Sequence, residues 1–154
     1  MLSEVISSEN ILLDVEVTSF EEAIEKSLQP FLEQKIVKQS YINSVLQIYH
    51  ETGPYIVITK HVAMPHAPID DGALKLAIGF TRLKEPVISG NKLNDPVKFL
   101  FPLSTTDTQS HLDLLSELAE LLSDKEFLEF LSQVQSSEQL INFLKEKEGV
   151  KKNA

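Results

Sequence analysis

The sequence of 154 residues contains no cysteine and no tryptophan. The lack of cysteine excludes a disulfide scaffold, a thiolate nucleophile on this chain and a cysteine-rich zinc site. No apolar run approaches the roughly 20 residues that a membrane-spanning helix needs. The N-terminus has no basic region followed by an apolar block, so we see no signal peptide. We therefore expect a cytoplasmic protein with no segment inserted in the membrane.

Positive charge is also scarce. The chain carries 14 lysine and arginine residues against 23 aspartate and glutamate residues, which gives a net charge of −9. Nucleic acids and anionic lipids bind proteins with basic patches, so we expect neither of them as a partner. The acidity either favours a basic protein partner or serves only to keep the protein in solution.

The size and composition are those of one ordinary domain. Apolar residues make up 42% and charged residues 24% of the chain, and this length is enough to bury a sizeable core. We find no internal repeat and no low-complexity segment. We expect one domain over residues 1–148 and a flexible tail over residues 149–154.

The first third of the chain predicts one strand and two helices. Alternating apolar residues over 11–17 indicate the strand, and Ser19 with acidic residues after it indicates the start of the first helix. Pro30 is expected to kink or split this helix. Ser40 is expected to cap the second helix, and Gly53 is expected to end it.

Short apolar runs in the middle third predict further strands, and the last third predicts helices. Short links between these strands imply some antiparallel pairs. We expect an α/β domain with a mixed sheet of about five strands and helices on both faces. The expected strands cover residues 55–58, 62–64, 76–80 and 97–103, and Glu85-Pro86 is expected to break the third of them after residue 83. The first expected helix covers residues 107–122. A second helix is expected to start at Ser123-Asp124, and a last helix is expected to start at Ser136-Ser137 and to end at Gly149.

Proline residues hold His66 in an extended segment. Pro65 precedes it and Pro68 follows two residues later, and both disfavour a helix there. A histidine fixed at the end of a strand is well placed to meet another molecule. The alternative is that His66 is an ordinary surface histidine in a proline-rich turn.

His111 is the second candidate. Strand 97–103 leads into the helix that starts near Asp107, and His111 lies at the start of that helix. If strand 97–103 lies beside the segment 55–64, His66 and His111 can meet at the same edge of the sheet. The helix N-terminus beside them offers free N–H groups and a positive dipole end, which suit an anion such as phosphate.

Common catalytic motifs are missing. The sequence has no Gly-x-Ser-x-Gly nucleophile elbow, no glycine-rich phosphate loop and no His-Glu-x-x-His zinc helix. Three histidines and a carboxylate can bind zinc, as in a metal-dependent hydrolase, but the spacing of His61 and His66 is unusual for zinc ligands. A histidine can also act as a nucleophile and carry a covalent group. Its reference pKa of about 6.5 allows the neutral form at cytoplasmic pH.

The stretch Ala63-Met64-Pro65-His66-Ala67, which follows a predicted strand, resembles the enzyme IIA domains of the bacterial phosphoenolpyruvate-dependent sugar phosphotransferase system. The match is to the fructose–mannitol superfamily and extends from about Phe20 to Leu144. With Gly53-Pro54-Tyr55-Ile56-Val57 and Asn94-Asp95-Pro96-Val97, the sequence is most similar to the ascorbate-type branch.

The resemblance implies a phosphotransferase that needs no cofactor and no metal. His66 matches the phosphorylated histidine, which accepts a phosphoryl group from the phosphocarrier protein HPr and passes it to a cysteine of enzyme IIB. The sugar, ascorbate or a related substrate, enters through the membrane permease enzyme IIC, which is a partner only indirectly. His111 matches the second active-site histidine, which hydrogen-bonds the phosphoryl oxygens and helps to offset their charge.

Two positions depart from the family pattern. Mannitol- and fructose-type members usually carry an Arg-Glu pair where this chain has Ile48-Tyr49-His50-Glu51. Lys60-His61 stands where many members have a small or apolar pair. Lys60 either adds positive potential for phosphate or is a surface lysine, and His61 is expected at the surface or at an interface.

The resemblance also leaves an alternative function and predicts a docking surface. Related domains act as regulatory modules that sense phosphorylation and bind a regulator. A site that exchanges phosphate with proteins should have an apolar rim, which we expect from Val62, Met64 and Leu112. The alternative is that these three residues belong to the core.

Overall fold

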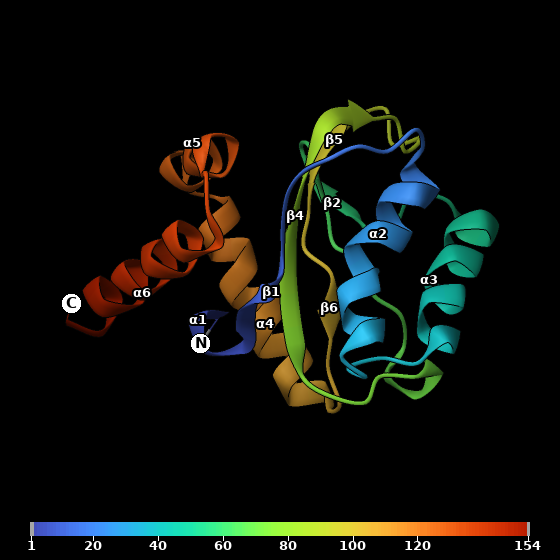
Figure 1. The fold of residues 1–154 in the computed structure, drawn as a ribbon, viewed down its shortest axis with the longest axis horizontal. Helices are drawn as coiled ribbons and strands as arrows, with labels where there is room; N and C mark the ends of the chain where they lie inside the picture. Colours follow the sequence, from blue (N-terminus) through green and yellow to red (C-terminus); the bar gives the residue numbers. More distant parts are fainter. Residues whose placement is uncertain (1, 154) are drawn as a thin grey trace.

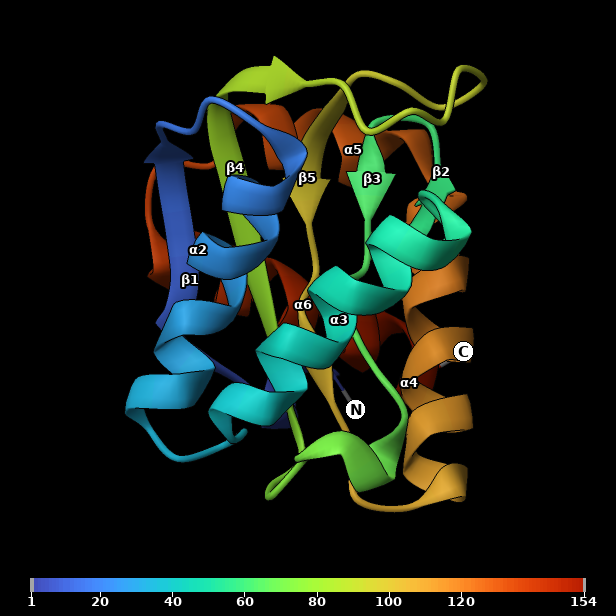
Figure 2. The same ribbon diagram turned by 90° about the vertical axis from the view of Figure 1, so that its right-hand side faces the viewer.

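A mixed β-sheet forms the middle layer of the molecule, and helices cover both of its faces (Figures 1 and 2). The computed structural model describes residues 2–153. The strands are β1 (Ile6–Val15), β2 (Val57–Thr59), β3 (Val62–Ala63), β4 (Ala77–Val87), β5 (Val97–Leu100) and β6 (Leu103–Ser104). The helices are α1 (Leu2–Val5), α2 (Phe20–Glu33), α3 (Gln39–Thr52), the 3₁₀ helix η1 (Ile69–Asp71), α4 (Thr108–Leu122), α5 (Lys125–Gln133) and α6 (Ser137–Asn153). The predicted fold class is confirmed, with six strands within residues 2–153 where about five were expected.

The strand order across the sheet is β1-β4-β5-β3-β2, and β6 also pairs with β4. β1 is parallel to β4 and β3 is parallel to β5, whereas β4 with β5 and β2 with β3 are antiparallel. In the parallel pair β3–β5, Ala63 lies opposite Leu100. The chain therefore leaves β3 and β5 at the same edge of the sheet.

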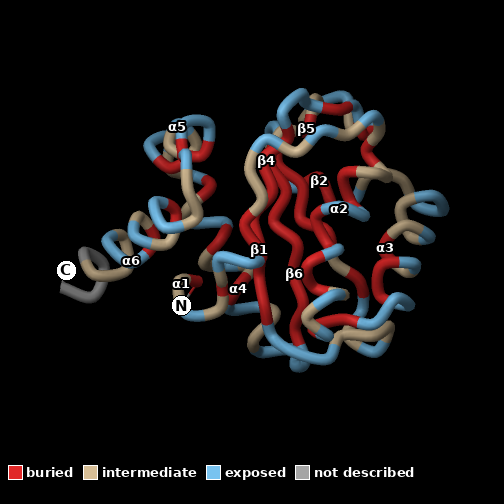
Figure 3. Tube along the Cα trace, viewed as in Figure 1, coloured by how far each residue is buried: buried red, intermediate tan, exposed pale blue. Residues whose placement is uncertain are grey.

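Two apolar clusters join the layers. Helices α2 and α3 lie on one face of the sheet, and α1, α4, α5 and α6 lie on the other (Figure 1). The first cluster includes Phe20 and Val45, and the second includes Leu118 and Phe127. Figure 3 shows the central strands as a buried layer between them. β4 is buried over residues 77–83, which fits its apolar start Ala77-Ile78-Gly79-Phe80.

The predicted limits of the first two helices are partly confirmed. The Ser19 hydroxyl accepts a hydrogen bond from the Glu22 N–H at the start of α2, and Gly53 ends α3 with a φ of 88°. The cap predicted at Ser40 is wrong, because α3 begins at Gln39 and its N-cap residue is Lys38. The Ser40 hydroxyl instead donates to the Asp71 carbonyl and ties α3 to η1.

Neither of two prolines ends its element. α2 is not split at Pro30 but continues through it to Glu33, and the proline is buried in the core. A kink at Pro30 stays a prediction, and the break predicted at Glu85-Pro86 is wrong. β4 continues through Pro86. The last register pair of β1 with β4 is at Leu83, and the β4–β5 register is irregular between Arg82 and Val87. The missing N–H of Pro86 therefore falls where neither neighbouring strand is in regular register.

Both ends of the chain contain more regular structure than the sequence indicated. β1 begins at Ile6 rather than at residue 11, and the short helix α1 precedes it. The helix end predicted at Gly149 is wrong, because α6 continues to Asn153. The flexibility of the tail 149–154 stays a prediction, and residue 154 lies outside the described residues. Over residues 2–153, no helix is both long and apolar enough to cross a membrane.

The buried guanidinium of Arg82 connects three parts of the fold. It donates to both carboxylate oxygens of Asp14 on β1, at 3.1 and 3.2 Å. It also donates to the carbonyls of Leu131 and Val134 at the end of α5, at 3.1 and 2.6 Å. Only 8% of the Arg82 side chain is exposed. Arg82 thus fixes the end of α5 to the sheet and satisfies two carbonyls that the helix leaves free.

We predict that Arg82→Met lowers the free energy of unfolding by about 3 kcal/mol, since it leaves backbone carbonyls and a carboxylate without their donor. Urea denaturation followed by circular dichroism measures the change. Lys84→Met on the same strand is the control, because Lys84 and its partner Glu16 are both exposed and such pairs contribute little. Equal losses for the two variants would contradict the prediction.

Candidate functional site

Two histidines meet where β3 and β5 leave the sheet. The ring centroids of His66 and His111 are 5.5 Å apart, and the ring planes are inclined by 46°. His66 follows β3 by three residues, and His111 lies in the first turn of α4, which follows β6. The geometry expected from strand pairing is confirmed: the two histidines are neighbours although 45 positions separate them in the sequence.

Cross-strand hydrogen bonds hold the chain before His66 extended. The Phe101 N–H donates to the Ala63 carbonyl at 2.8 Å, and the Leu103 N–H donates to the Pro65 carbonyl at 3.0 Å. On the other side, the Met64 N–H donates to the Ile56 carbonyl at 2.8 Å. The segment is therefore fixed between its two neighbours up to the residue before His66.

The tautomer of His66 follows from one hydrogen bond. Its Nδ1 lies 2.7 Å from the Met64 carbonyl oxygen. A carbonyl oxygen can only accept, so Nδ1 carries the proton of the neutral ring. Nε2 then keeps its lone pair and is the ring nitrogen free to act as a nucleophile or a base.

The environment of His66 favours this neutral form. Burial lowers the pKa of His66 below its ordinary value of 6.5, and the neighbouring His111 acts in the same direction. The hydrogen bond to the Met64 carbonyl opposes the shift of the pKa but does not cancel it. At neutral pH the ring is therefore uncharged and nucleophilic.

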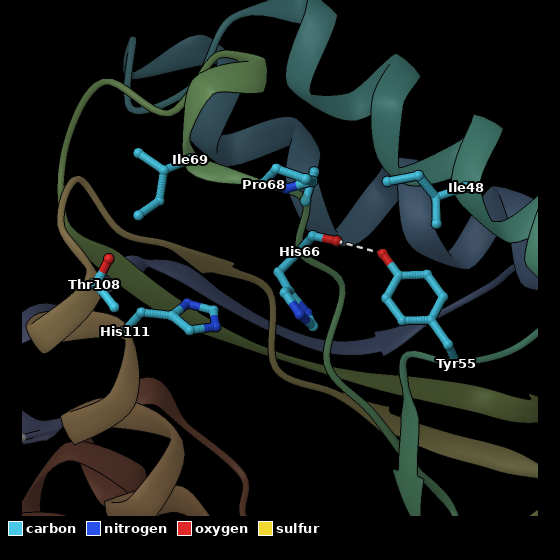
Figure 4. A pocket seen from close by; sticks show the side chains of 8 residues that line it. Ile48, Tyr55, His66, Pro68, Ile69, Thr108 and His111 are labelled. Atoms are coloured by element: carbon cyan, nitrogen blue, oxygen red, sulfur yellow. Dashed lines mark hydrogen bonds between the residues drawn. The ribbon is translucent and has the colours of Figure 1, made fainter.

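Helix α4 positions His111. Asp107 is the N-cap of α4, and its carboxylate accepts a hydrogen bond from the Ser110 N–H at 2.7 Å. The His111 ring extends from this first turn toward His66 (Figure 4). Its Nδ1 lies 3.3 Å from the Thr105 hydroxyl. The helix start predicted at Asp107 is confirmed, and it brings the positive end of the helix dipole beside the histidine pair.

The two histidines line a pocket of about 450 Å³. In Figure 4 the ring of His66 lies between the rings of His111 and Tyr55. Among the described residues, the lining contains no lysine and no arginine, so its polar groups are imidazoles, hydroxyls and backbone. The lining residues are Ile48, Tyr55, His66, Ala67, Pro68, Ile69, Thr108 and His111.

The other basic candidates lie elsewhere. His61 is exposed, with Nδ1 2.8 Å from the Pro96 carbonyl oxygen, and it lines a different hollow with Lys98. His50 is on the surface, where its Nε2 is 3.8 Å from the Glu21 carboxylate. Lys60 is exposed and does not line the His66 pocket.

The predicted apolar rim is wrong for two of its three residues. Val62 and Met64 are buried in the core, whereas Leu112 is 54% exposed. The apolar surface around the pocket comes instead from Ile48 and from Pro68, neither of which was predicted there. Among the described residues that line the pocket, Ile48 alone comes from the stretch that lacks the Arg-Glu pair.

Tyr55 is a site residue that the sequence did not reveal. It was predicted within a buried strand, but it lies before β2 and is 43% exposed. Its ring contacts that of His66 edge-on, with centroids 5.9 Å apart. A tyrosine in an otherwise aliphatic run beside a proline was the only signal for this position.

No group of three or more histidine, aspartate or glutamate side chains within residues 2–153 is arranged to hold a metal ion. The pocket itself presents a neutral histidine nucleophile, His66, beside a second imidazole, that of His111. Such a pair can accept a group at His66 Nε2 and hydrogen-bond it from His111.

Comparison with known families agrees with this arrangement. Residues 4–147 match the family described as "Phosphoenolpyruvate-dependent sugar phosphotransferase system, EIIA 2". The chain belongs to this family. It is therefore an enzyme IIA component of the sugar phosphotransferase system.

Relatives of this enzyme IIA represent two branches. The mannitol-specific cryptic phosphotransferase enzyme IIA component of Escherichia coli (strain K12) is 33% identical over 93% of this chain and 97% of its own length. The ascorbate-specific EIIA component of the same organism is 24% identical over 89% of this chain and 90% of its own length. The identity is higher for the mannitol-type relative, so the ascorbate-type assignment stays a prediction.

Solved structures have the same fold. The solution structure of the cryptic mannitol enzyme IIA from Escherichia coli superposes with a TM-score of 0.82 at 32% identity, over 92% of this chain and 95% of that chain. A second neighbour is enzyme IIA of the mannitol system in a complex with phosphorylated enzyme IIB, also from Escherichia coli. Its TM-score is 0.78 at 21% identity, over 90% of this chain and 95% of that chain.

We predict that His66 titrates below pH 6.5 in the folded enzyme IIA, because its pKa is lowered. Between the two pKa values the folded state binds fewer protons than the unfolded state. The stability that this difference provides is therefore complete above pH 6.5 and is lost as the pH falls toward the folded pKa. A ¹⁵N-NMR titration of the imidazole, with urea-unfolded protein as the reference, measures both values. A folded midpoint at or above the unfolded one would contradict the prediction.

Proposed function

We propose that this enzyme IIA is the phosphoryl carrier of a sugar uptake system in the cytoplasm. His66 accepts a phosphoryl group from HPr and passes it to a cysteine of enzyme IIB. The observation that supports this most is the Nδ1 hydrogen bond to Met64, which leaves Nε2 free in a pocket shared with His111. The permease enzyme IIC would be reached only through enzyme IIB.

The first step is an in-line displacement at phosphorus. The lone pair of His66 Nε2 attacks the phosphorus of phosphohistidine on HPr, and a new N–P bond forms. The N–P bond on HPr breaks, and its imidazole leaves with the electron pair. The proton on His66 Nδ1 stays in its hydrogen bond to the Met64 carbonyl, so no proton has to leave the ring.

The second step reverses the role of His66. The thiolate of the enzyme IIB cysteine attacks the same phosphorus, and an S–P bond forms. The bond to His66 Nε2 breaks, and the electron pair returns to that nitrogen. The complex of the mannitol enzyme IIA with phosphorylated enzyme IIB supports enzyme IIB as the partner, because that protein has the same fold.

His111 is the group that offsets the charge of the transferred phosphoryl. The centroid of its ring lies 5.5 Å from that of His66, so a ring N–H of His111 can be directed to the phosphoryl oxygens. The Thr108 hydroxyl and the start of α4 add further positive dipoles at the pocket. Because Ile48 occupies the α3 side of the pocket, no guanidinium shares this task there.

The surface around the pocket suits transient protein docking. Pro68 and Leu112 are exposed, and the chain as a whole is acidic with a net charge of −9. Such a charge increases the rate of encounter with basic partners. The sugar does not contact this chain in the proposed mechanism, so mannitol-type, ascorbate-type and related substrates all remain compatible with it.

We predict that His66→Gln abolishes labelling by phosphoenolpyruvate, enzyme I and HPr, because glutamine has no nucleophilic ring nitrogen. Acid-labile phosphate on the wild type, located by mass spectrometry, is the positive result. His61→Gln is the matched control and should be labelled like the wild type, since His61 lies outside the pocket. Labelling of His66→Gln would refute the proposal.

The same assay separates the carrier from the regulatory alternative. Both functions require phosphorylation of His66. Only the carrier discharges its phosphate to a purified enzyme IIB thiol, which is measured as loss of label from this chain and gain on enzyme IIB. A phosphorylated chain that passes no phosphate to enzyme IIB proteins of the mannitol and ascorbate type would favour the regulatory function.

We predict that His111→Ala slows phosphoryl transfer about 100-fold, the order of magnitude for loss of one donor to a developing charge. His66 should still be labelled, because its own nitrogen remains. His111→Gln keeps an N–H donor and should recover part of the rate. His50→Ala is the control for removal of a distant histidine. A wild-type rate for His111→Ala, measured by rapid quench, would contradict the assigned role.

A further inference from the structure

The peptide group between His66 and Ala67 is bound on both of its polar atoms by tyrosine hydroxyls. The Tyr55 hydroxyl donates a hydrogen bond to the His66 carbonyl oxygen, with 2.9 Å between the two oxygens (Figure 4). The Ala67 N–H donates to the Tyr41 hydroxyl at 3.1 Å. These tyrosines come from different elements, so one peptide plane is fixed from two directions.

Tyr41 is the buried member of this pair. It lies in α3 with 2% of its surface exposed, and its hydroxyl donates to the Leu103 carbonyl on β6 at 2.7 Å. Burial raises the pKa of Tyr41 to about 12. Its hydroxyl therefore stays protonated, accepts from Ala67 and donates to Leu103 at the same time. Tyr41 links α3, β6 and the residue after His66.

Tyr55 is the exposed member of the pair. It lies between the end of α3 and β2, and its ring edge contacts the ring of His66. Burial of its hydroxyl raises the pKa of Tyr55 above its ordinary value. The hydroxyl therefore remains a donor to the His66 carbonyl at neutral pH.

The segment needs such partners because its own prolines cannot provide them. Pro65 and Pro68 have no N–H, so neither can fix the chain by donating to a neighbouring strand. The last cross-strand bond before His66 is made by the Pro65 carbonyl. The direction of the His66 ring depends on the backbone at this point, and so does its Nδ1 contact with Met64.

We propose that Tyr55 and Tyr41 are positioning residues: they clamp the His66–Ala67 peptide so that Nδ1 stays on the Met64 carbonyl and Nε2 faces the phosphoryl donor. The proposal rests on the proposed function for its kinetic consequence. Its structural consequence, a single ring tautomer held by two hydroxyls, does not depend on phosphoryl transfer. A shift of about 1 Å at the reacting atom is enough to slow a transfer strongly.

Tyr55→Phe is the main test, because it removes the hydroxyl and keeps the ring that contacts His66. Tyr49→Phe is the matched control. The Tyr49 hydroxyl likewise donates to a backbone carbonyl, that of Ser89, but it does not line the pocket. Both variants are first compared by thermal unfolding, and both are measured by two readouts.

The first readout is ¹⁵N-NMR of the His66 imidazole at neutral pH. The wild type should show Nδ1 protonated and Nε2 bare. In Tyr55→Phe the two nitrogen shifts should move toward each other, because the ring then samples both tautomers. Tyr49→Phe should match the wild type. An unchanged tautomer in Tyr55→Phe would overturn the clamp, whether or not the chain accepts phosphate.

The second readout is transfer from phosphorylated HPr. Tyr55→Phe should lower kcat about tenfold and leave KM for HPr unchanged. A raised KM with an unchanged kcat would make Tyr55 a docking contact and overturn the positioning role. An equal loss in Tyr49→Phe would also overturn it, because the effect would then be general destabilisation.

Tyr41→Phe gives an independent second variant. It should show the same mixture of tautomers and the same fall in kcat, with some loss of thermal stability because the Leu103 carbonyl loses its donor. If the wild type takes no phosphate from HPr, the proposed function fails while the NMR readout still decides the clamp. An unchanged tautomer in Tyr41→Phe would likewise overturn the positioning role of Tyr41.

Discussion

The parallel pairing of β3 with β5 is the constraint on which the site depends. β3 and β5 are parallel, with Ala63 opposite Leu100, so both strands run in the same direction and end at the same edge of the sheet. After β3 the chain continues to His66, and after β5 it continues through β6 into the first turn of α4, where His111 lies. An antiparallel pairing would have sent the two histidines to opposite ends of the sheet. The topology thus provides the distance of 5.5 Å between the rings.

The chemical character of the pocket comes from burial without fixed positive charge. Burial lowers the pKa of His66 and makes its ring a neutral nucleophile. In the proposed mechanism the same surroundings, with no lysine or arginine among the described lining residues, stabilise a bound phosphoryl group through dipoles and His111. For a phosphoryl carrier this balance is useful, because strong stabilisation of the phosphorylated state would slow its release. A carrier has to accept and release the same group.

The sequence predicted each histidine as a candidate because the signals are local: prolines beside His66, and a helix start with Asp107 before His111. Their meeting was predicted only on the condition that the two strands before them are neighbours, as β3 and β5 are. The sequence did not predict Tyr41 or Arg82, because their partners are distant in the chain. The Leu103 carbonyl is 62 positions from Tyr41, and the Val134 carbonyl is 52 positions from Arg82. The breaks predicted at proline residues were wrong for a related reason. Local sequence rules register only that a proline lacks a backbone N–H. The tertiary structure determines whether a neighbouring strand or helical turn needed that N–H as a hydrogen-bond donor.

The prolines that made His66 recognisable in the sequence also create the problem that the surrounding structure solves. They keep the segment extended, but they remove N–H groups that would otherwise anchor it to the sheet. The hydrogen bond from Nδ1 to Met64 is local and fixes the ring only if the backbone around it is fixed. Cross-strand bonds do this before His66, and side-chain hydroxyls from α3 and from the segment before β2 do it afterwards. The choice of reacting nitrogen is therefore a property of the assembled fold rather than of the motif alone.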